Sequence, residues 1–122
     1  MRVMLLDVKK GTGLQGISIP DKLSAYYEKI GCQIIDIVMR RIGGRDFDII
    51  CDDERLFDEH PIVSALDCMF SPALVGNLIF AHHDADGNMT GLNLGDEEII
   101  RNAQIQLYDT VRGENHTVIM FD

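Results

Sequence analysis

The sequence lacks an apolar run long enough for a membrane-spanning helix, which needs about 18 consecutive residues. The apolar opening, residues 1–6, stops at Asp7, Lys9 and Lys10, and no small-residue cleavage site of a secretion signal follows it. We therefore predict no membrane contact and interpret residues 2–8 as a strand.

Cysteine is scarce: there are three cysteines, and no two of them have the C-x-x-C spacing of metal or redox sites. Cys32, Cys51 and Cys68 lie among apolar neighbours, where a free thiol behaves as a small hydrophobic side chain. This usage argues against a disulfide framework and predicts a cytoplasmic protein.

Positive charge is also in short supply, since the chain has 11 Lys and Arg against 20 Asp and Glu, a net charge of −9. Nucleic acids and anionic membranes attract proteins through a surplus of Lys and Arg, so we predict neither as a partner. The deficit is uneven. Residues 1–45 carry eight basic and four acidic side chains, whereas residues 46–122 carry three and sixteen. The acidic part predicts a protein partner with a basic surface.

The residues that are present predict one compact α+β domain over residues 1–122, with a mostly antiparallel sheet built from hairpins and two packed helices. Apolar residues at helical spacing predict a first helix over 21–30, closed by Gly31. A second helix is predicted from Asp96, because negative charge stabilises the start of a helix. Its predicted inner face consists of Ile99, Ile100, Ala103 and Leu107.

Alternating apolar residues and turn signals predict the strands. Gly43-Gly44 and Asp86-Gly87 are typical of tight hairpin turns. Between Pro61 and Pro72 no long helix can form, but a short helical turn over 62–66 is expected to fit. The predicted strands are residues 2–8, 14–19, 32–42, 46–51, 73–81 as one central buried strand, 89–92 and 117–121.

The segment from His82 to Asn88 is the most site-like part of the sequence, because imidazole and carboxylate groups follow the end of a strand. A calcium loop that begins at Asp84 needs Gly at its sixth position and Glu at its twelfth, where the chain has Met89 and Gly95. His82 and His83 do not readily share a zinc ion, because neighbouring strand residues point to opposite faces. A metal site of His82, Asp84 and Asp86 is the alternative to a polar turn.

The sequence contains no recognisable catalytic constellation, and we predict no cofactor. Cys51 precedes Asp52-Asp53-Glu54, whose negative charge disfavours the thiolate, the reactive form of cysteine. The same three carboxylates, with His82 or His83, are the material for a small metal-dependent hydrolase. This enzyme class stays open as the alternative to a non-enzymatic protein.

Three segments carry a family resemblance: Phe47–Glu54, Leu74–Phe80 and Leu92–Ile99. They resemble a family of small proteins, described only as a domain of unknown function, that occurs in phages, plasmids and bacterial chromosomes. The resemblance covers residues 21–105, and the chain departs from it at 58–72 and after Tyr108. The family has no assigned activity, so it transfers no catalytic residue. It does imply a mobile-element protein, and small acidic proteins of that setting often counter host defence by occupying the basic channel of a nuclease.

The resulting hypothesis is a non-enzymatic acidic protein that binds a basic protein. Self-association is a third hypothesis, in which the basic first third of one copy meets the acidic remainder of another. The carboxylates predicted to form the acidic binding face are Asp52, Asp53, Glu54, Asp58, Glu59, Asp96, Glu97 and Glu98.

Overall fold

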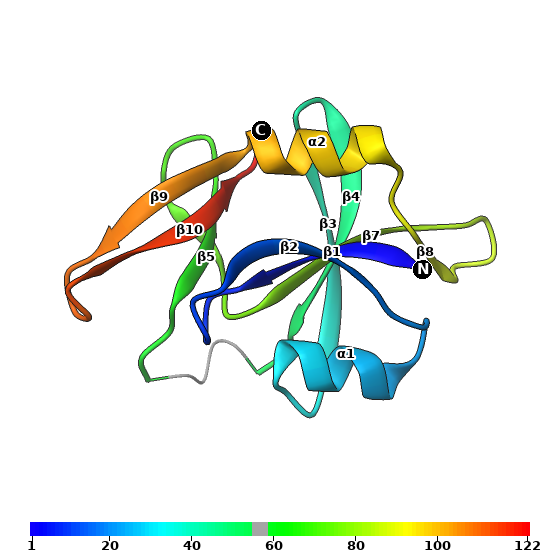
Figure 1. The fold of residues 1–122 in the computed structure, drawn as a ribbon, viewed down its shortest axis with the longest axis horizontal. Coiled ribbons are helices and arrows are strands. Elements are labelled where there is room, and N and C mark those ends of the chain that lie inside the picture. Colours follow the sequence, from blue (N-terminus) through cyan, green and yellow to red (C-terminus); the bar gives the residue numbers. More distant parts are fainter. Residues whose placement is uncertain (55–58) are drawn as a thin grey trace.

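The computed structural model describes residues 1–54 and 59–122, which form two β-sheets and two helices (Figure 1). The larger sheet, called the main sheet here, has the strand order β2-β1-β7-β4-β3, with the short β8 attached to β7. The second sheet has the order β6-β5-β10-β9. The main-sheet strands are β1 (Arg2–Asp7), β2 (Gly13–Ser18), β3 (Ile35–Ile42), β4 (Arg45–Asp52), β7 (Leu78–His83) and β8 (Met89–Thr90). The other elements are β5 (Val63–Leu66), β6 (Pro72–Val75), β9 (Gln104–Asp109), β10 (Glu114–Met120), α1 (Leu23–Ile30) and α2 (Leu94–Asn102).

Antiparallel pairing dominates both sheets. Among the described strands only the pair β5 and β10 is parallel. The predicted α+β class, with hairpins and two packed helices, is confirmed. Neither of the two helices is long and apolar enough to cross a membrane, within residues 1–54 and 59–122.

The hairpin between β3 and β4 turns at Gly43 and Gly44, as predicted. Both glycines have positive φ, 55° and 81°, which a two-residue turn of this hand requires and which side chains disfavour. The carboxylate of Asp122 accepts a hydrogen bond from each of the two glycine amides, both at 2.7 Å. The turn is therefore fixed to the end of the second sheet.

Helix α1 ends where its sequence predicts. Gly31 is left-handed with φ 75°, and its N–H donates to the carbonyl of Tyr27 at 2.8 Å. The Nζ of Lys9 donates to the carbonyl of Ile30 at 3.0 Å, which satisfies another free carbonyl of the last turn. These contacts fix the helix on the main sheet, with Tyr26 and Ile30 buried.

The main sheet lies between two apolar layers. Figure 1 shows α1 and α2 on opposite sides of this sheet. Successive strand residues point to opposite faces, so both faces of the central strands are apolar. The layer toward α1 contains Val3, Leu5, Tyr26, Ile30, Ile50, Ile79 and Ala81. The layer toward α2 and the second sheet contains Met4, Leu6, Phe47, Ile49, Phe80, Ile100 and Ile119.

The run 73–81, predicted as one strand, is in fact two strands in different sheets. Gly76 has φ 78° and breaks the run between β6 and β7. Asn77 is buried at 4% exposure, and its Oδ1 accepts from the backbone N–H of Val8 and Lys9 at 3.0 and 3.1 Å. Its Nδ2 donates to the carbonyl of Lys29 at 3.1 Å. These bonds hold the crossover between the sheets, while β7 takes the predicted central place.

The helical turn predicted over 62–66 is wrong, because Val63–Leu66 forms strand β5. The register pairs Ala65 with Ile119 and Leu66 with Met120 of β10. The secondary structure of this segment is determined by pairing with a strand far away in the sequence, which no local pattern reveals.

The second helix is shorter than predicted. It ends at Asn102, and Leu107, placed on its inner face by helical spacing, lies in strand β9. Residues 104–109 alternate between exposed and half-buried positions and pair with β10. The sequence of this segment fits both a period of two and a helical period. Pairing with β10 determines that it forms a strand. The predicted final strand is confirmed and begins earlier, at Glu114.

Replacing Asn77 with alanine is expected to destabilise the protein by about 3 kcal/mol, because three buried or partly buried backbone groups lose their hydrogen-bond partner. Urea unfolding, followed by circular dichroism, measures the change. The control is Asn115→Ala, at an exposed position of β10, which is expected to change the unfolding free energy little. Equal effects of the two substitutions would contradict the role given to Asn77.

Candidate functional site

The end of strand β7 places His82 and His83 on opposite faces of the main sheet, as strand alternation predicts. The Nε2 of His82 lies 3.1 Å from a carboxylate oxygen of Asp96. The Nδ1 of His83 lies 2.6 Å from a carboxylate oxygen of Asp48. Each histidine therefore has a carboxylate partner of its own, supplied by a different element.

Asp96 lies on the first turn of α2 and is 3% exposed. It forms a capping box with Asn93, in which the Asp96 N–H donates to Asn93 Oδ1 and the Asn93 N–H donates to the Asp96 carboxylate. Arg45 Nη1 donates to the same carboxylate at 2.7 Å. Burial alone would raise the pKa of Asp96, but the hydrogen bonds from Asn93, Arg45 and His82 outweigh it and hold that pKa below its usual range.

His82 is positioned by two contacts. Its ring stacks on Phe47, with centroids 5.0 Å apart and an interplanar angle of 17°. Its Nε2 faces Asp96, so the imidazole fills the space between the sheet and the start of α2. His82 thus acts as a partner of Asp96 within the fold.

The neighbouring carboxylate, Glu97, is 5% exposed and is also paired. Arg2 Nη2 lies 3.1 Å from Glu97 Oε1, and Arg101 Nη2 lies 3.7 Å from the same atom. A buried charge is tolerated only when it is paired and hydrogen-bonded. The first turn of α2 is therefore neutralised by groups from three strands of the main sheet and from the helix itself.

The pair Asp48–His83 has a different character. The Asp48 side chain is 10% exposed, whereas that of His83 is 46% exposed. A buried carboxylate that holds an imidazole through Nδ1 is the geometry of an oriented general base. Among the described residues no hydroxyl or thiol is hydrogen-bonded to His83, so the pair has no attached nucleophile.

The three residues of the alternative metal site do not converge. His82 faces Asp96, whereas Asp84 and Asp86 lie in the β7–β8 turn. The Asp84 carboxylate accepts the backbone N–H groups of Asn88 and Asp86, and the Asn88 bond is the main cause that lowers the pKa of Asp84. In the part of the chain that the structure describes, no three His, Cys, Asp or Glu side chains are arranged to hold a metal ion.

Three of the predicted binding carboxylates, Asp52, Asp53 and Glu54, lie where β4 ends, and we call them the acidic end. Asp53 and Glu54 are exposed and Asp52 is half-buried. The Asp53 N–H donates to the carbonyl of Ile34, and the Asp52 carboxylate accepts the Glu54 N–H at 2.9 Å. Burial first, and then the charges of Asp52 and Glu54, raise the pKa of the nearby Cys32 thiol.

The other predicted carboxylates lie elsewhere. Asp58 is outside the described residues, and Glu59 is exposed. Asp96 contacts Arg45, at the beginning of β4, so its helix lies at the opposite end of that strand, about 23 Å from the acidic end by strand geometry. Of the three predicted carboxylates in α2, only Glu98 is exposed. Six of the eight predicted residues are thus divided between two ends of the main sheet, three at each end.

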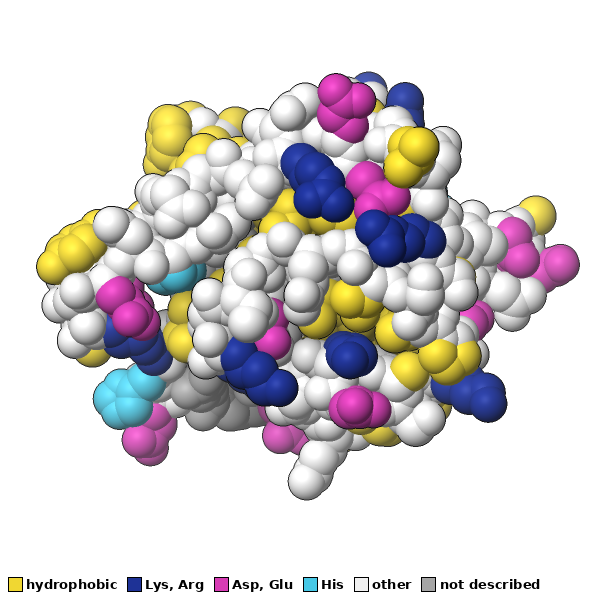
Figure 2. Space-filling view, viewed as in Figure 1, with side chains coloured by type: hydrophobic (Ala, Val, Ile, Leu, Met, Phe, Trp, Pro, Cys, Tyr) yellow, Lys and Arg dark blue, Asp and Glu magenta, His cyan; other side chains and the backbone are white. Residues whose placement is uncertain are grey.

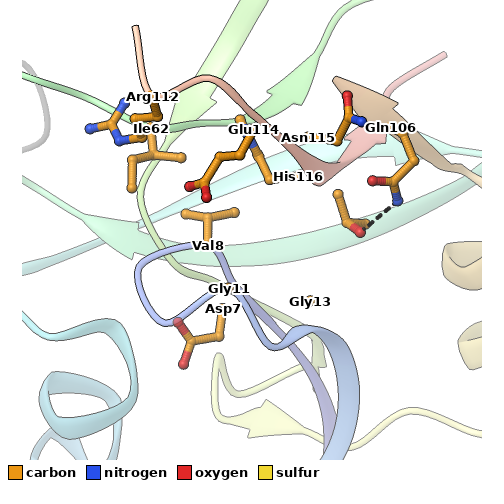
Figure 3. Close-up of a pocket in the computed structure, with 11 residues that line it drawn as sticks. Asp7, Val8, Gly11, Gly13, Ile62, Gln106, Arg112, Glu114, Asn115 and His116 are labelled. Carbon is orange, nitrogen blue, oxygen red and sulfur yellow. Dashed lines mark hydrogen bonds between the residues drawn. The ribbon is translucent and has the colours of Figure 1, made fainter. Parts of the chain in front are cut away.

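A polar cavity of about 220 Å³ lies between the β1–β2 turn and the β9–β10 hairpin (Figure 3). Its polar groups are largely used within the fold. Arg112 donates to Asp109 and to the carbonyl of His60, both at 2.8 Å, and His116 Nε2 contacts the carbonyl of Val63 at 2.6 Å. Figure 3 shows the Glu114 carboxylate pointing toward Val8. The cavity is lined by Asp7, Val8, Gly11, Gly13, Ile62, Gln106, Arg112, Glu114, Asn115, His116 and Thr117.

The sequence predicts no role for Arg2 or Asp48, and it predicts only that Arg45, among other basic residues, neutralises the acidic remainder of the chain. For Asp48 the sequence does contain an indication, because it is the one charged residue in the otherwise apolar segment 47–51. A buried strand carboxylate needs a partner, which predicts a cation on the neighbouring strand. For the two arginines no local pattern predicts contact with a helix that begins about fifty or more residues later in the chain.

Comparison with known proteins assigns the chain to a family. The model of the family described as Domain of unknown function (DUF3846) matches residues 1–113. A search of curated proteins and a search of solved structures each found no match. The family match extends from β1 through β9 and confirms the predicted resemblance. The chain therefore belongs to the DUF3846 family, a domain of unknown function.

Proposed function

We propose that the protein is a non-enzymatic binding protein whose acidic end engages a basic surface on another protein. The observation that carries this proposal is local: adjacent carboxylates gather at the end of β4 beside an apolar side chain, Ile34, that is 49% exposed. Protein interfaces combine an apolar centre with charges that steer the partner and fix its orientation. The acidic end offers both features on neighbouring residues.

The ion pairs of α2 support this proposal, because they compensate the charge of three arginines whose side chains stay about half exposed. Arg2 and Arg101 pair with Glu97, and Arg45 pairs with Asp96. On the face shown in Figure 2, acidic side chains lie at separate places, including the β7–β8 turn at the right, with basic side chains between several of them. The surface charge is thus divided into local groups, and a basic partner would recognise one such group.

The partner class follows from the chemistry of the acidic end. Side chains of Lys and Arg that normally hold phosphates present the complementary charge, so a nuclease with a basic nucleic-acid channel is the partner that we propose. In a mobile-element protein this interaction would counter host defence. Association through exposed charges is fast, and it weakens as salt shortens the screening length below about 8 Å.

A fluorescent peptide of alternating arginine and leucine is expected to bind the protein at low salt. Asp52→Asn, Asp53→Asn and Glu54→Gln together are expected to weaken binding about tenfold, because three partly exposed ion pairs are lost. Fluorescence anisotropy at low and high salt measures the affinity.

The control variant removes three exposed carboxylates elsewhere: Glu28→Gln, Asp86→Asn and Glu98→Gln. It changes the net charge equally and is expected to weaken binding less than about twofold. If both triple variants lose the same affinity, the peptide reads only net charge, and a binding site at the acidic end is refuted.

The thiol of Cys32 reports the electrostatic potential at the acidic end. Because Asp52 and Glu54 help to raise its pKa, Asp52→Asn with Glu54→Gln is expected to lower that pKa. Thiolate is the reactive form, so iodoacetamide should then alkylate Cys32 faster at mildly alkaline pH. Mass spectrometry of alkylation rates across pH separates Cys32 from the exposed Cys68 and the buried Cys51. An unchanged pH profile would show that these carboxylates do not act on Cys32.

The rival class is a metal-dependent hydrolase built from the same carboxylates and from His82 or His83. Thermal unfolding with added Zn²⁺, Mn²⁺ or Mg²⁺ separates the two classes, because a ligand that binds the folded state raises the melting temperature. We expect no metal-specific shift. A shift that disappears in the variant without Asp52, Asp53 and Glu54 charges would replace the binding proposal with the hydrolase.

A further inference from the structure

Strand β3 is an edge strand of the main sheet as residues 1–54 and 59–122 form it. Its only strand neighbour among the described residues is β4. The strand has eight residues, and the apolar side chains of Ile37 and Met39 on it are 46% and 55% exposed. An edge strand with exposed apolar residues is a template for pairing with another strand, and natural proteins usually block such edges with charge or proline.

The turn geometry shows which backbone groups of β3 face outward. A two-residue turn makes Ile42 and Arg45 a hydrogen-bonded pair, so even-numbered residues of β3 bond to β4 and odd-numbered residues point away from it. The bonds confirm this: the carbonyl of Arg41 accepts from the Asp122 N–H, and that of Met39 from the side chain of Arg40. Within the described residues, no backbone group pairs with the outward N–H of Ile37 or Met39.

We propose that β3 pairs antiparallel with β3 of a second copy of the chain, around a two-fold axis at Val38. In this register the Ile37 of each copy lies opposite the Met39 of the other, and four outward backbone hydrogen bonds form. Asp36 of each copy lies opposite Arg40 of the other. The arrangement joins two main sheets into one continuous sheet.

Charge complementarity selects this register. For two identical antiparallel strands in one sheet, the two-fold axis passes through a single residue, because opposed side chains share a face. An axis at Asp36 or at Arg40 places like charges opposite each other, which is destabilising. An axis at Ile37 or Met39 places Val38 opposite a charged residue. Only the axis at Val38 places Asp36 opposite Arg40 and, at the same time, Ile37 opposite Met39.

The side chains fit this pairing on both faces of the joined sheet. Ile37 and Met39 share the face that carries α1, and with their counterparts they form a four-residue apolar cluster. Asp36, Val38 and Arg40 share the other face, at non-hydrogen-bonded positions where opposed side chains come closest. Near the end of β3 the outward carbonyl of Arg41 already accepts the Asp122 N–H, so the proposed pairing uses the residues of the strand before Arg41. The inference goes beyond the proposed function, because it uses β3 and not the acidic end.

The test is a charge exchange across the proposed axis. In Asp36→Arg both facing positions are basic, and in Arg40→Asp both are acidic, so each variant alone is expected to be monomeric. Mixed in equal amounts, the two variants are expected to form a heterodimer, because every facing pair is again of opposite charge. Sedimentation velocity up to millimolar concentration measures the mass, and the unmodified protein is expected to be a dimer.

Two further variants keep the test independent of folding defects. Met39→Pro removes an outward N–H that β4 does not use, so it is expected to give a monomer with an unchanged circular dichroism spectrum. Lys22→Asp alters an exposed cation outside β3 and is expected to remain dimeric. An unmodified protein that stays monomeric at millimolar concentration overturns the inference. So does a single variant that still dimerises, or a mixture that stays monomeric although the unmodified protein dimerises.

Discussion

Asp96 and Glu97 are buried on the first turn of α2, where an unpaired charge would cost several kcal/mol. Their partners are Arg2 of β1, Arg45 of β4 and His82 of β7, together with Arg101 of the helix. The helix can therefore lie on the main sheet only when these three strands are correctly paired. Once it does, Ile100 completes the apolar layer between the sheets. The ion network thus links strand order to helix position.

The same network shapes the charge that remains outside. It uses three arginines and one histidine near the start of β4, whereas the acidic end at the other end of that strand keeps Asp53 and Glu54 exposed. The charge asymmetry in the sequence is therefore reduced in space, because two arginines of the basic first third, Arg2 and Arg45, compensate carboxylates that come late in the chain. What remains for a partner is a small local group of carboxylates beside Ile34. The orientation of a bound partner would therefore depend on where these carboxylates lie more than on the net charge of the protein.

Sequence patterns predicted the parts of the fold in which the conformational preference of a residue and its tertiary contacts favour the same structure. Gly31 ends α1 and Gly43-Gly44 turn the hairpin because only a glycine adopts these conformations without strain. The apolar run 73–81 failed as one strand because a hydrogen-bonding side chain, Asn77, fixes a crossover that hydrophobicity does not record. For the site, alternation placed His82 and His83 on opposite faces, but their carboxylate partners come from distant elements and needed the tertiary structure.

The two proposed surfaces are adjacent, and this makes them interdependent. With the axis at Val38, Arg41 of the second copy lies opposite Ile35, whose own partner on β4 is Asp52. Pairing of β3 thus brings a cation toward the acidic end. A basic partner and the Arg41 of a second copy then compete for the same carboxylates. By thermodynamic linkage, binding of either one lowers the affinity of the chain for the other by the same factor. Self-association would in this way limit the acidic end to partners that bind it more strongly than another copy of the chain.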